Sequence, residues 1–203
     1  MKTRINEIVS DWKRIKNHCR TTVNKNFTEN EPTQQFKEAL LISEHSPIRL
    51  LEVDWSWDNI KYWLSTEWSR HKFEKFISTQ REDRTNVDRN SKPQDSPVKF
   101  DGYANAQSLI DAFRKRLCFQ AHPEATELAL DFKRTIAQYE PELSFVLVPN
   151  CIYRGGCPEF SQCACHFWDN FVKNNKDVDM TDIRQRYKRY FEMVCSKQKE
   201  ETE

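Results

Sequence analysis

The stretch WSRHKFEKFISTQREDR, residues 68–84, decides how the chain is interpreted. Its amphipathic first half predicts the end of a helix, and its second half combines a hydroxyl, an amide and two guanidinium groups without a glycine. Guanidinium forks match phosphate oxygens and aromatic faces stack on rings, so this composition favours a pocket for a phosphorylated, ring-bearing ligand. The alternative interpretation is a solvated basic face on a helix. The anion-binding candidates in the stretch are Arg70, His71, Lys72, Arg81 and Arg84.

The composition limits the classes of protein that need to be considered. A chain of 203 residues suits one sizeable domain. The net charge is +1, so no overall field recruits nucleic acid or a membrane. Only three glycines are present, which excludes a glycine-rich phosphate loop because such a turn needs several glycines at fixed spacing. Side chains and helix ends must therefore hold any nucleotide or flavin.

The expected location follows from the N-terminus and the cysteines. The opening residues, MKTRINE, contain no apolar signal region, and no apolar run is long enough to span a bilayer. We therefore expect a cytoplasmic protein that does not bind membranes. Seven cysteines, an odd number, then favour free thiols or metal ligands over a disulfide framework.

Most of the periodic segments predict helices. Apolar residues at helical spacing predict one helix over 5–15, with Thr3 as a possible cap, and another over 58–68, capped by Asp58. Three further helices are expected over 109–117, from Pro123 to 139, and from Thr181 or Asp182 to 194.

The remaining segments predict strands and loops. Residues 51–57 alternate as a half-buried strand does, and residues 144–148 are a short β-prone run. Polar residues 24–35 are expected to form a loop. Residues 85–102 predict a second, long loop that is disordered, acts as a lid or crosses a subunit boundary. Residues 1–203 are thus expected to form a single α/β or α+β domain that is rich in helix.

Several motifs, taken in order, resemble the flavin-dependent thymidylate synthases. The resemblance covers roughly residues 43–163. It is carried by the turn His45-Ser46-Pro47, then Arg70-His71-Lys72, Ser78-Thr79-Gln80-Arg81-Glu82-Asp83-Arg84, Asn105-Ala106-Gln107-Ser108-Leu109, Arg116 with Ala121-His122-Pro123-Glu124, and the segment from Cys151 to Glu159. Each motif is weak by itself, and their order and separation make the match more specific.

The resemblance implies a fold and a reaction. It implies a helix-rich single domain in which helices flank a mixed or antiparallel sheet. The implied reaction is the reductive methylation of dUMP to dTMP, with FAD as the flavin, NADPH as its reductant and methylenetetrahydrofolate as the one-carbon donor. The family forms its active sites between the subunits of a homotetramer, so the resemblance also implies a homotetramer.

The resemblance also implies roles for particular residues. Arg116 matches the arginine that stabilises negative charge on the uracil oxygens, so it is the expected catalytic residue. The expected substrate-binding residues are Arg70, Ser78, Gln80, Arg81 and Arg84. The expected cofactor-binding residues are His71, Lys72, Asn105, Gln120 and His122.

The sequence departs from the family pattern at several of these positions. Lys72 replaces an arginine and thereby loses a planar fork. Glu82 or Asp83 stands where the family has a serine, Gln107 replaces an arginine, and His122 replaces a glutamine. These differences leave two alternatives open: modification of a related pyrimidine deoxynucleotide, such as hydroxymethylation, or an inactive homologue.

A cysteine-rich segment, residues 151–166, is the other distinctive feature. Its candidate ligands for a zinc ion are Cys151, Cys157, Cys163, Cys165 and His166. The spacing differs from paired Cys-x-x-Cys knuckles, so reduced thiols around a buried turn are the alternative. Together with the basic run, the segment also leaves open a zinc-stabilised nucleic-acid-binding or interaction module. The balanced net charge argues against nucleic acid as a partner.

Overall fold

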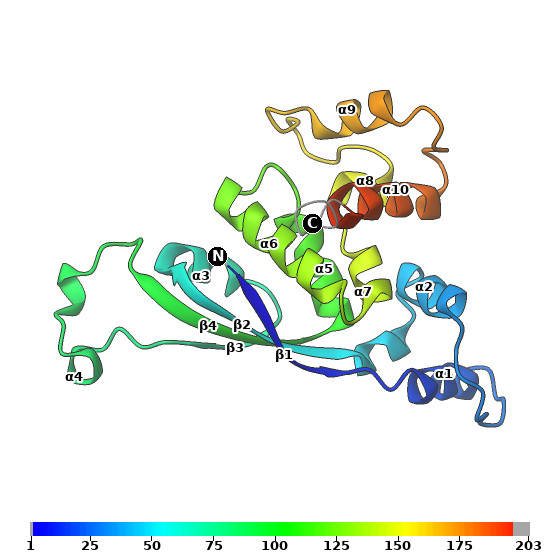
Figure 1. Cartoon of the computed structure of the whole chain (residues 1–203), viewed down its shortest axis with the longest axis horizontal. Coiled ribbons are helices and arrows are strands. Elements are labelled where there is room, and N and C mark those ends of the chain that lie inside the picture. Colours follow the sequence, from blue (N-terminus) through cyan, green and yellow to red (C-terminus); the bar gives the residue numbers. More distant parts are fainter. Residues whose placement is uncertain (1, 197–203) are drawn as a thin grey trace, which may run out of the picture.

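The computed structural model describes residues 2–196 and contains one antiparallel sheet (Figure 1). Its four strands lie in the order β1-β2-β4-β3. Their bounds are β1 Thr3–Val9, β2 Glu52–Lys61, β3 Glu74–Ile77 and β4 Pro97–Asn105. All three pairings are antiparallel. The prediction of a helix-rich single domain with an antiparallel sheet is therefore confirmed.

Helices make up most of the remaining chain. The α-helices are α1 Trp12–Thr21, α2 Gln34–Ile42, α3 Tyr62–Trp68, α4 Glu82–Thr85, α5 Ala106–Arg116, α6 Pro123–Ile136, α7 Pro141–Val146, α8 Asn150–Arg154, α9 Phe167–Asn174 and α10 Ile183–Cys195. Two 3₁₀ turns are η1 Ser46–Leu50 and η2 Arg89–Ser91. The predicted helices from 109, from Pro123 and after Asp182 are confirmed as α5, α6 and α10, and Asp182 caps α10 through its carboxylate.

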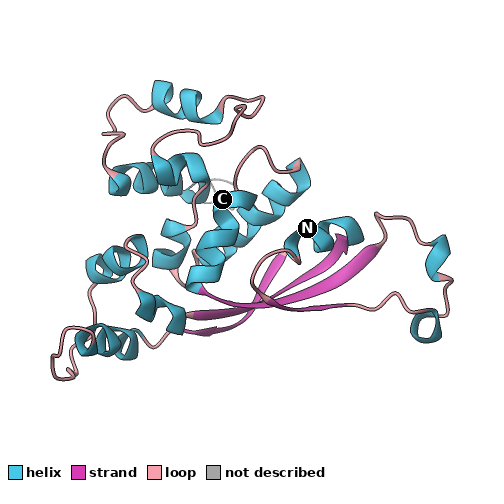
Figure 2. Cartoon of the chain, turned by 180° about the vertical axis from the view of Figure 1, so that it is seen from behind, coloured by secondary structure: helices cyan, strands magenta, loops and turns pink. Residues whose placement is uncertain are grey.

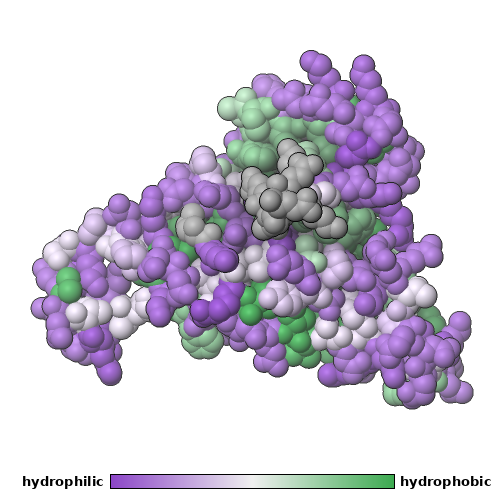
Figure 3. Space-filling model, in the orientation of Figure 1, coloured by the Kyte–Doolittle hydropathy of each residue, from purple (hydrophilic) through white to green (hydrophobic). Residues whose placement is uncertain are grey.

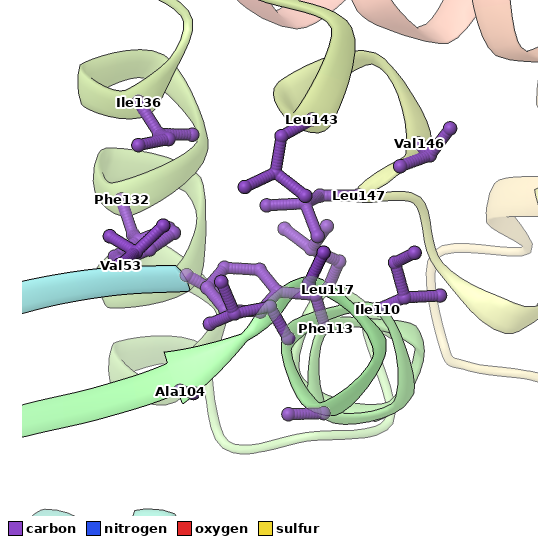
Figure 4. Close-up of a cluster of buried hydrophobic side chains, with 14 of the residues drawn as sticks. Val53, Ala104, Ile110, Phe113, Leu117, Phe132, Ile136, Leu143, Val146 and Leu147 are labelled. Carbon is purple, nitrogen blue, oxygen red and sulfur yellow. The ribbon is translucent and has the colours of Figure 1, made fainter. Parts of the chain in front are cut away.

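Helices α5 and α6 pack on one face of the sheet (Figure 2). Along β4, Val98, Phe100, Gly102 and Ala104 are buried while the residues between them are exposed. In the core, Val53 and Ala104 of the strands lie beside side chains of α5 and α6, including Phe113 and Phe132 (Figure 4). The apolar face of the sheet and the apolar stripes of two helices thus form one hydrophobic core.

The prediction of a helix over residues 5–15 is wrong for its first half. Residues 3–9 form strand β1, and Asp11, rather than Thr3, caps the helix that follows. The cause is a β-bulge between Ile5 and Glu7, because Ile5 pairs with Trp55 and Ile8 pairs with Val53. An extra residue in a strand places side chains three apart on one face, which imitates the period of a helix.

A second bulge explains the misplaced start of α3. Strand β2 continues to Lys61, so Asp58 lies within the strand and caps no helix. The register shifts between Trp57, which pairs with Phe100, and Ile60, which pairs with Val98. Asn59, between them, has a positive φ of 58°. The three-residue spacing of Trp57 and Ile60 is therefore a bulged strand and not a helix.

Three other predicted segments need correction. The expected loop over 85–102 ends earlier, because β4 begins at Pro97 and its alternating pattern buries every second side chain. The β-prone run 144–148 overlaps α7, which begins with a proline at its first turn. The polar loop from residue 24 ends at Thr33, which caps α2.

A long projection extends beyond one end of the sheet and is called the arm, residues 78–96 (Figure 1). It contains α4 and η2, and its visible surface is mostly hydrophilic (Figure 3). Its base is fixed by Ser78, whose N–H donates to Lys99 O at 3.0 Å and whose Oγ accepts from Lys99 N at 3.0 Å. Within residues 2–196, no helix combines the length and apolar character needed to cross a bilayer.

Candidate active site

Arg116, the last residue of α5, lies at the centre of a hydrogen-bonded cluster. Its Nη1 is 2.8 Å from Glu67 Oε2 and its Nη2 donates to Glu67 O at 2.7 Å. Its Nε donates to His71 Nε2 at 2.8 Å. The guanidinium also lies over the Trp68 ring, 5.9 Å from the centroid. Charge-assisted bonds on three nitrogens fix both the position and the plane of this cation.

The cluster forms because α3 and the turn between α5 and α6 pack together. Lys61, just before α3, pairs with Glu124 in the first turn of α6, with Nζ 2.6 Å from Oε1. The Trp63 ring meets the His122 ring edge-on, with centroids 4.6 Å apart. These contacts place Glu67, one turn further along α3, opposite the end of α5.

His71 is a neutral member of this cluster. Burial, the charge of Arg116 and the charge of Lys75 lower the pKa of His71 to about 4. Its ring packs against Trp68, with centroids 5.8 Å apart. A neutral imidazole can accept a hydrogen bond from Arg116, whereas an imidazolium cannot. His71 therefore serves as an acceptor for Arg116 at neutral pH.

Arg70 and Lys72, on either side of His71, are exposed to solvent. Burial lowers the pKa of Arg116, and the nearby charge of Arg70 lowers it further, while Glu67 opposes both effects. Arg70 is therefore close enough to Arg116 for their charges to interact. Within one chain, Arg116 thus contacts His71 directly and lies near Arg70.

The other predicted phosphate-binding residues lie on the arm. Arg81 forms two hydrogen bonds with Asp83, from Nε to Oδ1 at 3.0 Å and from Nη2 to Oδ2 at 2.8 Å. Arg84 Nε lies 3.8 Å from Asp83 Oδ2. Gln80 lines a polar recess of the arm beside Arg89. Because α4 lies far out on the arm, Arg81 at its N-cap and Arg84 within it are separated from Arg116 within one chain (Figure 1).

Three predicted cofactor residues have local structural partners. Asn105 caps α5, and its Oδ1 accepts from Ser108 N at 3.0 Å. It thus lies at the opposite end of α5 from Arg116, about 15 Å along an 11-residue helix. Gln120 is exposed and donates to Ser161 O at 2.6 Å, which ties the cysteine-rich segment to the turn after α5. His122 caps α6 through Nδ1, which accepts from Glu124 N.

The side chains of the cysteine-rich segment lie close together as free thiols. Cys118, Cys151, Cys157 and Cys163 line one small cavity, and Cys163 Sγ is 3.4 Å from Cys165 Sγ. Burial raises the pKa of the Cys151 thiol to about 12, so it stays protonated at neutral pH.

The predicted zinc ligands do not form a metal site here. Across the described residues 2–196, no three His, Cys, Asp or Glu side chains lie together as metal ligands do. His166 lies outside the thiol group, with its side chain 64% exposed and its Nδ1 3.5 Å from Asp169 Oδ2. Of these cysteines, Cys151 and Cys163 are buried, whereas Cys165 is exposed.

Sequence reasoning missed Glu67, which is the main partner of Arg116. The sequence contained a signal for this role. Glu67 precedes His71 by four residues at the end of a predicted helix, and residues four apart lie on the same helix face. Sequence reasoning also did not connect Cys118 with the cysteine-rich segment, although both line the same cavity. Its position on the turn after α5 becomes informative only once the fold places that turn beside α8 and α9.

Comparison with solved structures places the chain in the fold of the flavin-dependent thymidylate synthases. A crystal structure of thymidylate synthase X from Helicobacter pylori with FAD and dUMP matches it with a TM-score of 0.60 and 12% identity, over 72% of this chain and 99% of that chain. A second structure of the flavin-dependent thymidylate synthase ThyX from Helicobacter pylori, complexed with FAD and dUMP, gives a TM-score of 0.56 and 13% identity, over 68% of this chain and 97% of that chain. No protein-family model and no curated protein matches the sequence. At these identities the likeness establishes the fold alone.

Proposed function

We propose that the chain is a flavin-dependent enzyme that methylates the uracil C5 of dUMP, with methylenetetrahydrofolate as one-carbon donor and NADPH as reductant. The observation that carries this proposal is the Arg116 cluster. Its guanidinium is partly buried and fixed, its Nε is bound to neutral His71, and both residues belong to motifs that resemble those of the family. The shared fold supports the same conclusion.

The chemistry requires charge stabilisation at the uracil oxygens. When C5 becomes nucleophilic, negative charge moves onto those oxygens, and a guanidinium held in place stabilises it without reorganisation. Arg116 is held by Glu67, His71 and Trp68 before any substrate arrives. It therefore satisfies the requirement for a preorganised donor.

The residues near Arg116 suit a flavin nucleotide. Exposed Arg70 and Lys72 supply positive charge for a pyrophosphate, and the half-buried Trp63 ring supplies a flat surface. A bound reduced flavin would supply the two electrons that complete the methyl group. The role of this chain's residues is to bind its phosphates and to hold the base beside Arg116.

The proposed enzyme works as a homotetramer with sites shared between chains. Arg81 and Arg84 lie on the arm, remote from Arg116 of the same chain (Figure 1). A phosphate site that uses both sets of arginines therefore needs arms from a neighbouring subunit. In this arrangement the function of the arm is to supply phosphate-binding arginines to a neighbouring subunit.

A related nucleotide modification is the second candidate, and one observation favours it. Asp83 already neutralises Arg81 through two hydrogen bonds, so Arg81 is less available to a phosphate dianion. A nucleotide whose base or phosphate contacts differ from those of dUMP would suit such an arm. Hydroxymethylation at C5 uses the same base chemistry and the same Arg116.

The decisive experiment is flavin-dependent tritium release from C5-labelled dUMP. Purified protein is supplied with FAD, NADPH and methylenetetrahydrofolate, and both tritium and the nucleotide product are measured. Tritium with dTMP as product supports methylation, and tritium with hydroxymethyl-dUMP supports the second candidate. If saturating FAD and dUMP neither raise the melting temperature nor yield tritium release, both the methylation and the hydroxymethylation of dUMP are wrong.

A further inference from the structure

Glu67 makes two contacts with one guanidinium, and they come from different parts of the residue. Its carboxylate binds Arg116 Nη1 and its backbone carbonyl accepts from Arg116 Nη2. The Arg116 side chain is only 13% exposed and that of Glu67 is 28% exposed. Because the two contacts grip both terminal nitrogens, Glu67 sets the plane of the guanidinium as well as its location.

The Arg116–His71 bond determines the tautomer of His71. An arginine Nε always donates, so His71 Nε2 must accept and cannot carry a proton. The remaining proton of a neutral imidazole is then on Nδ1. His71 is thus left with Nδ1–H as its own free donor.

The same contacts define which Arg116 donors remain. A guanidinium has five N–H groups, and three are used by Glu67 and His71, which leaves two. The Trp68 ring lies under the guanidinium at 5.9 Å and packs beside His71. Glu67, Trp68 and His71 therefore enclose Arg116 on several sides and restrict the directions in which it can present its remaining donors.

We propose that Glu67 is a positioning residue, which orients Arg116 toward the nucleotide base and, through Arg116, keeps His71 in the Nδ1–H form as a second donor for that site. This inference rests on the proposed function for its activity test, and it can also be tested on the protein without turnover. It assigns the role to a carboxylate that the motif comparison did not include.

The first test is the effect of Glu67 variants on turnover. Glu67→Gln keeps an oxygen acceptor and removes the charge, while Glu67→Ala removes both. We expect kcat to fall by about 100-fold in Glu67→Ala and by less in Glu67→Gln, because a displaced catalytic group costs rate more than binding. The KM for dUMP should change by less than about threefold.

A matched control separates positioning from the loss of any ion pair. Glu29→Gln breaks the Lys13–Glu29 pair, whose atoms are 3.4 Å apart and whose glutamate side chain is 92% exposed. It should leave kcat and KM unchanged. If Glu67→Ala folds and keeps the wild-type kcat, the positioning role is wrong. If the wild type itself releases no tritium, the proposed reaction fails, and the second test still decides the inference.

The second test reads the tautomer of His71 directly. Full-length protein loaded with FAD and labelled with ¹⁵N-histidine is examined by NMR, and His71 is assigned from a His71→Gln variant. We expect the Nδ1–H tautomer in the wild type and a shift toward Nε2–H in both Arg116→Ala and Glu67→Ala. A wild-type His71 with its proton on Nε2, or a spectrum that Glu67→Ala does not change, would overturn the inference whether or not the enzyme turns over dUMP.

Discussion

Gly102 of β4 lies directly against the indole ring of Trp55 of β2. A Cβ built on Gly102 would come within 2.3 Å of Trp55 Cζ2 and within 2.5 Å of Trp55 Cε2. The indole is fully buried, and it also meets Phe73 and Phe132 edge-on at centroid distances of 5.2 and 5.3 Å. The ring fills the space that a side chain at position 102 would occupy, so this glycine is a packing requirement of the core.

The first prediction concerns this contact. Gly102→Ala should reduce the free energy of unfolding by about 3 kcal/mol, because a buried indole held by neighbours on several sides cannot move away. Gly156→Ala is the matched control, since a Cβ there would meet nothing within 4 Å. Urea unfolding of both variants measures the difference. Equal midpoints for the two variants would show that Trp55 can be displaced at no cost.

The second prediction concerns the Arg114–Glu44 ion pair, which anchors α5 to the turn before η1. Burial lowers the pKa of Arg114, but the hydrogen bond and charge of Glu44 outweigh it and the pKa is raised. Glu44→Gln leaves this partly buried cation with only the more distant carboxylate of Asp111, whose Oδ1 is 3.7 Å from Arg114 Nη1, so we expect a loss of about 2 kcal/mol in unfolding free energy. Glu29→Gln, at an exposed pair, should change it by less than about 0.5 kcal/mol. A comparable loss in both variants would contradict the anchoring role.

The third prediction uses the low pKa of His71. Its pKa is about 4 in the folded protein and 6.5 when unperturbed, so between these values the unfolded chain binds a proton that the folded chain does not. The contribution of His71 to stability is therefore complete above pH 6.5 and is lost as the pH falls toward 4. With its partial exposure taken into account, we expect about 1–2 kcal/mol. The difference in unfolding free energy between wild type and His71→Gln, measured from pH 4 to 7, should show this slope, and a constant difference would exclude it.

The fourth prediction concerns the arm. Replacing residues 81–92 with a short Gly-Ser linker keeps the Gln94 and Ser96 carbonyls, which accept from Trp63 N and Tyr62 N. The removed side chains are mostly exposed, so the melting temperature should change little. We expect the molecular mass by light scattering to fall below that of a tetramer and tritium release to be lost. A shortened chain that keeps both the mass and the turnover of the wild type would rule out the arm as a shared element of the active site.

The errors in predicting the fold from sequence have a common physical cause. At Ile5 to Ile8 and at Trp57 to Ile60, a β-bulge puts residues three apart on one face, so that a strand carries the apolar period of a helix. Only pairing with a neighbouring strand creates the bulge, and pairing is not visible in a local window. The helices α5, α6 and α10 were predictable because their caps and apolar stripes are local.

The candidate site was predictable in its parts but not in its assembly. Arg116 and His71 could be named from motifs, and their 2.8 Å contact follows only from the packing of α3 against α5. Arg81 shares a motif with Arg70, yet the arm carries it away from the cluster. Sequence proximity therefore concealed the separation of Arg81 from the cluster, and sequence distance concealed the contact between residues 67 and 116.

The last prediction concerns Lys133, which is fully buried between α6, α7 and α10. Its Nζ donates to Ser144 O and lies 5.3 Å from the centroid of the Tyr190 ring. Burial lowers the pKa of Lys133 to about 8, against 10.5 when unperturbed, so between these values the unfolded chain binds a proton that the folded chain lacks. Stability should therefore rise with pH in this window, by about 1.5 kcal/mol between pH 8 and 9.5. Lys133→Met removes the titrating group and should lack this rise, with stability at pH 7 equal to or above that of the wild type. Parallel pH profiles for the two proteins would mean that Lys133 keeps its ordinary pKa despite its burial.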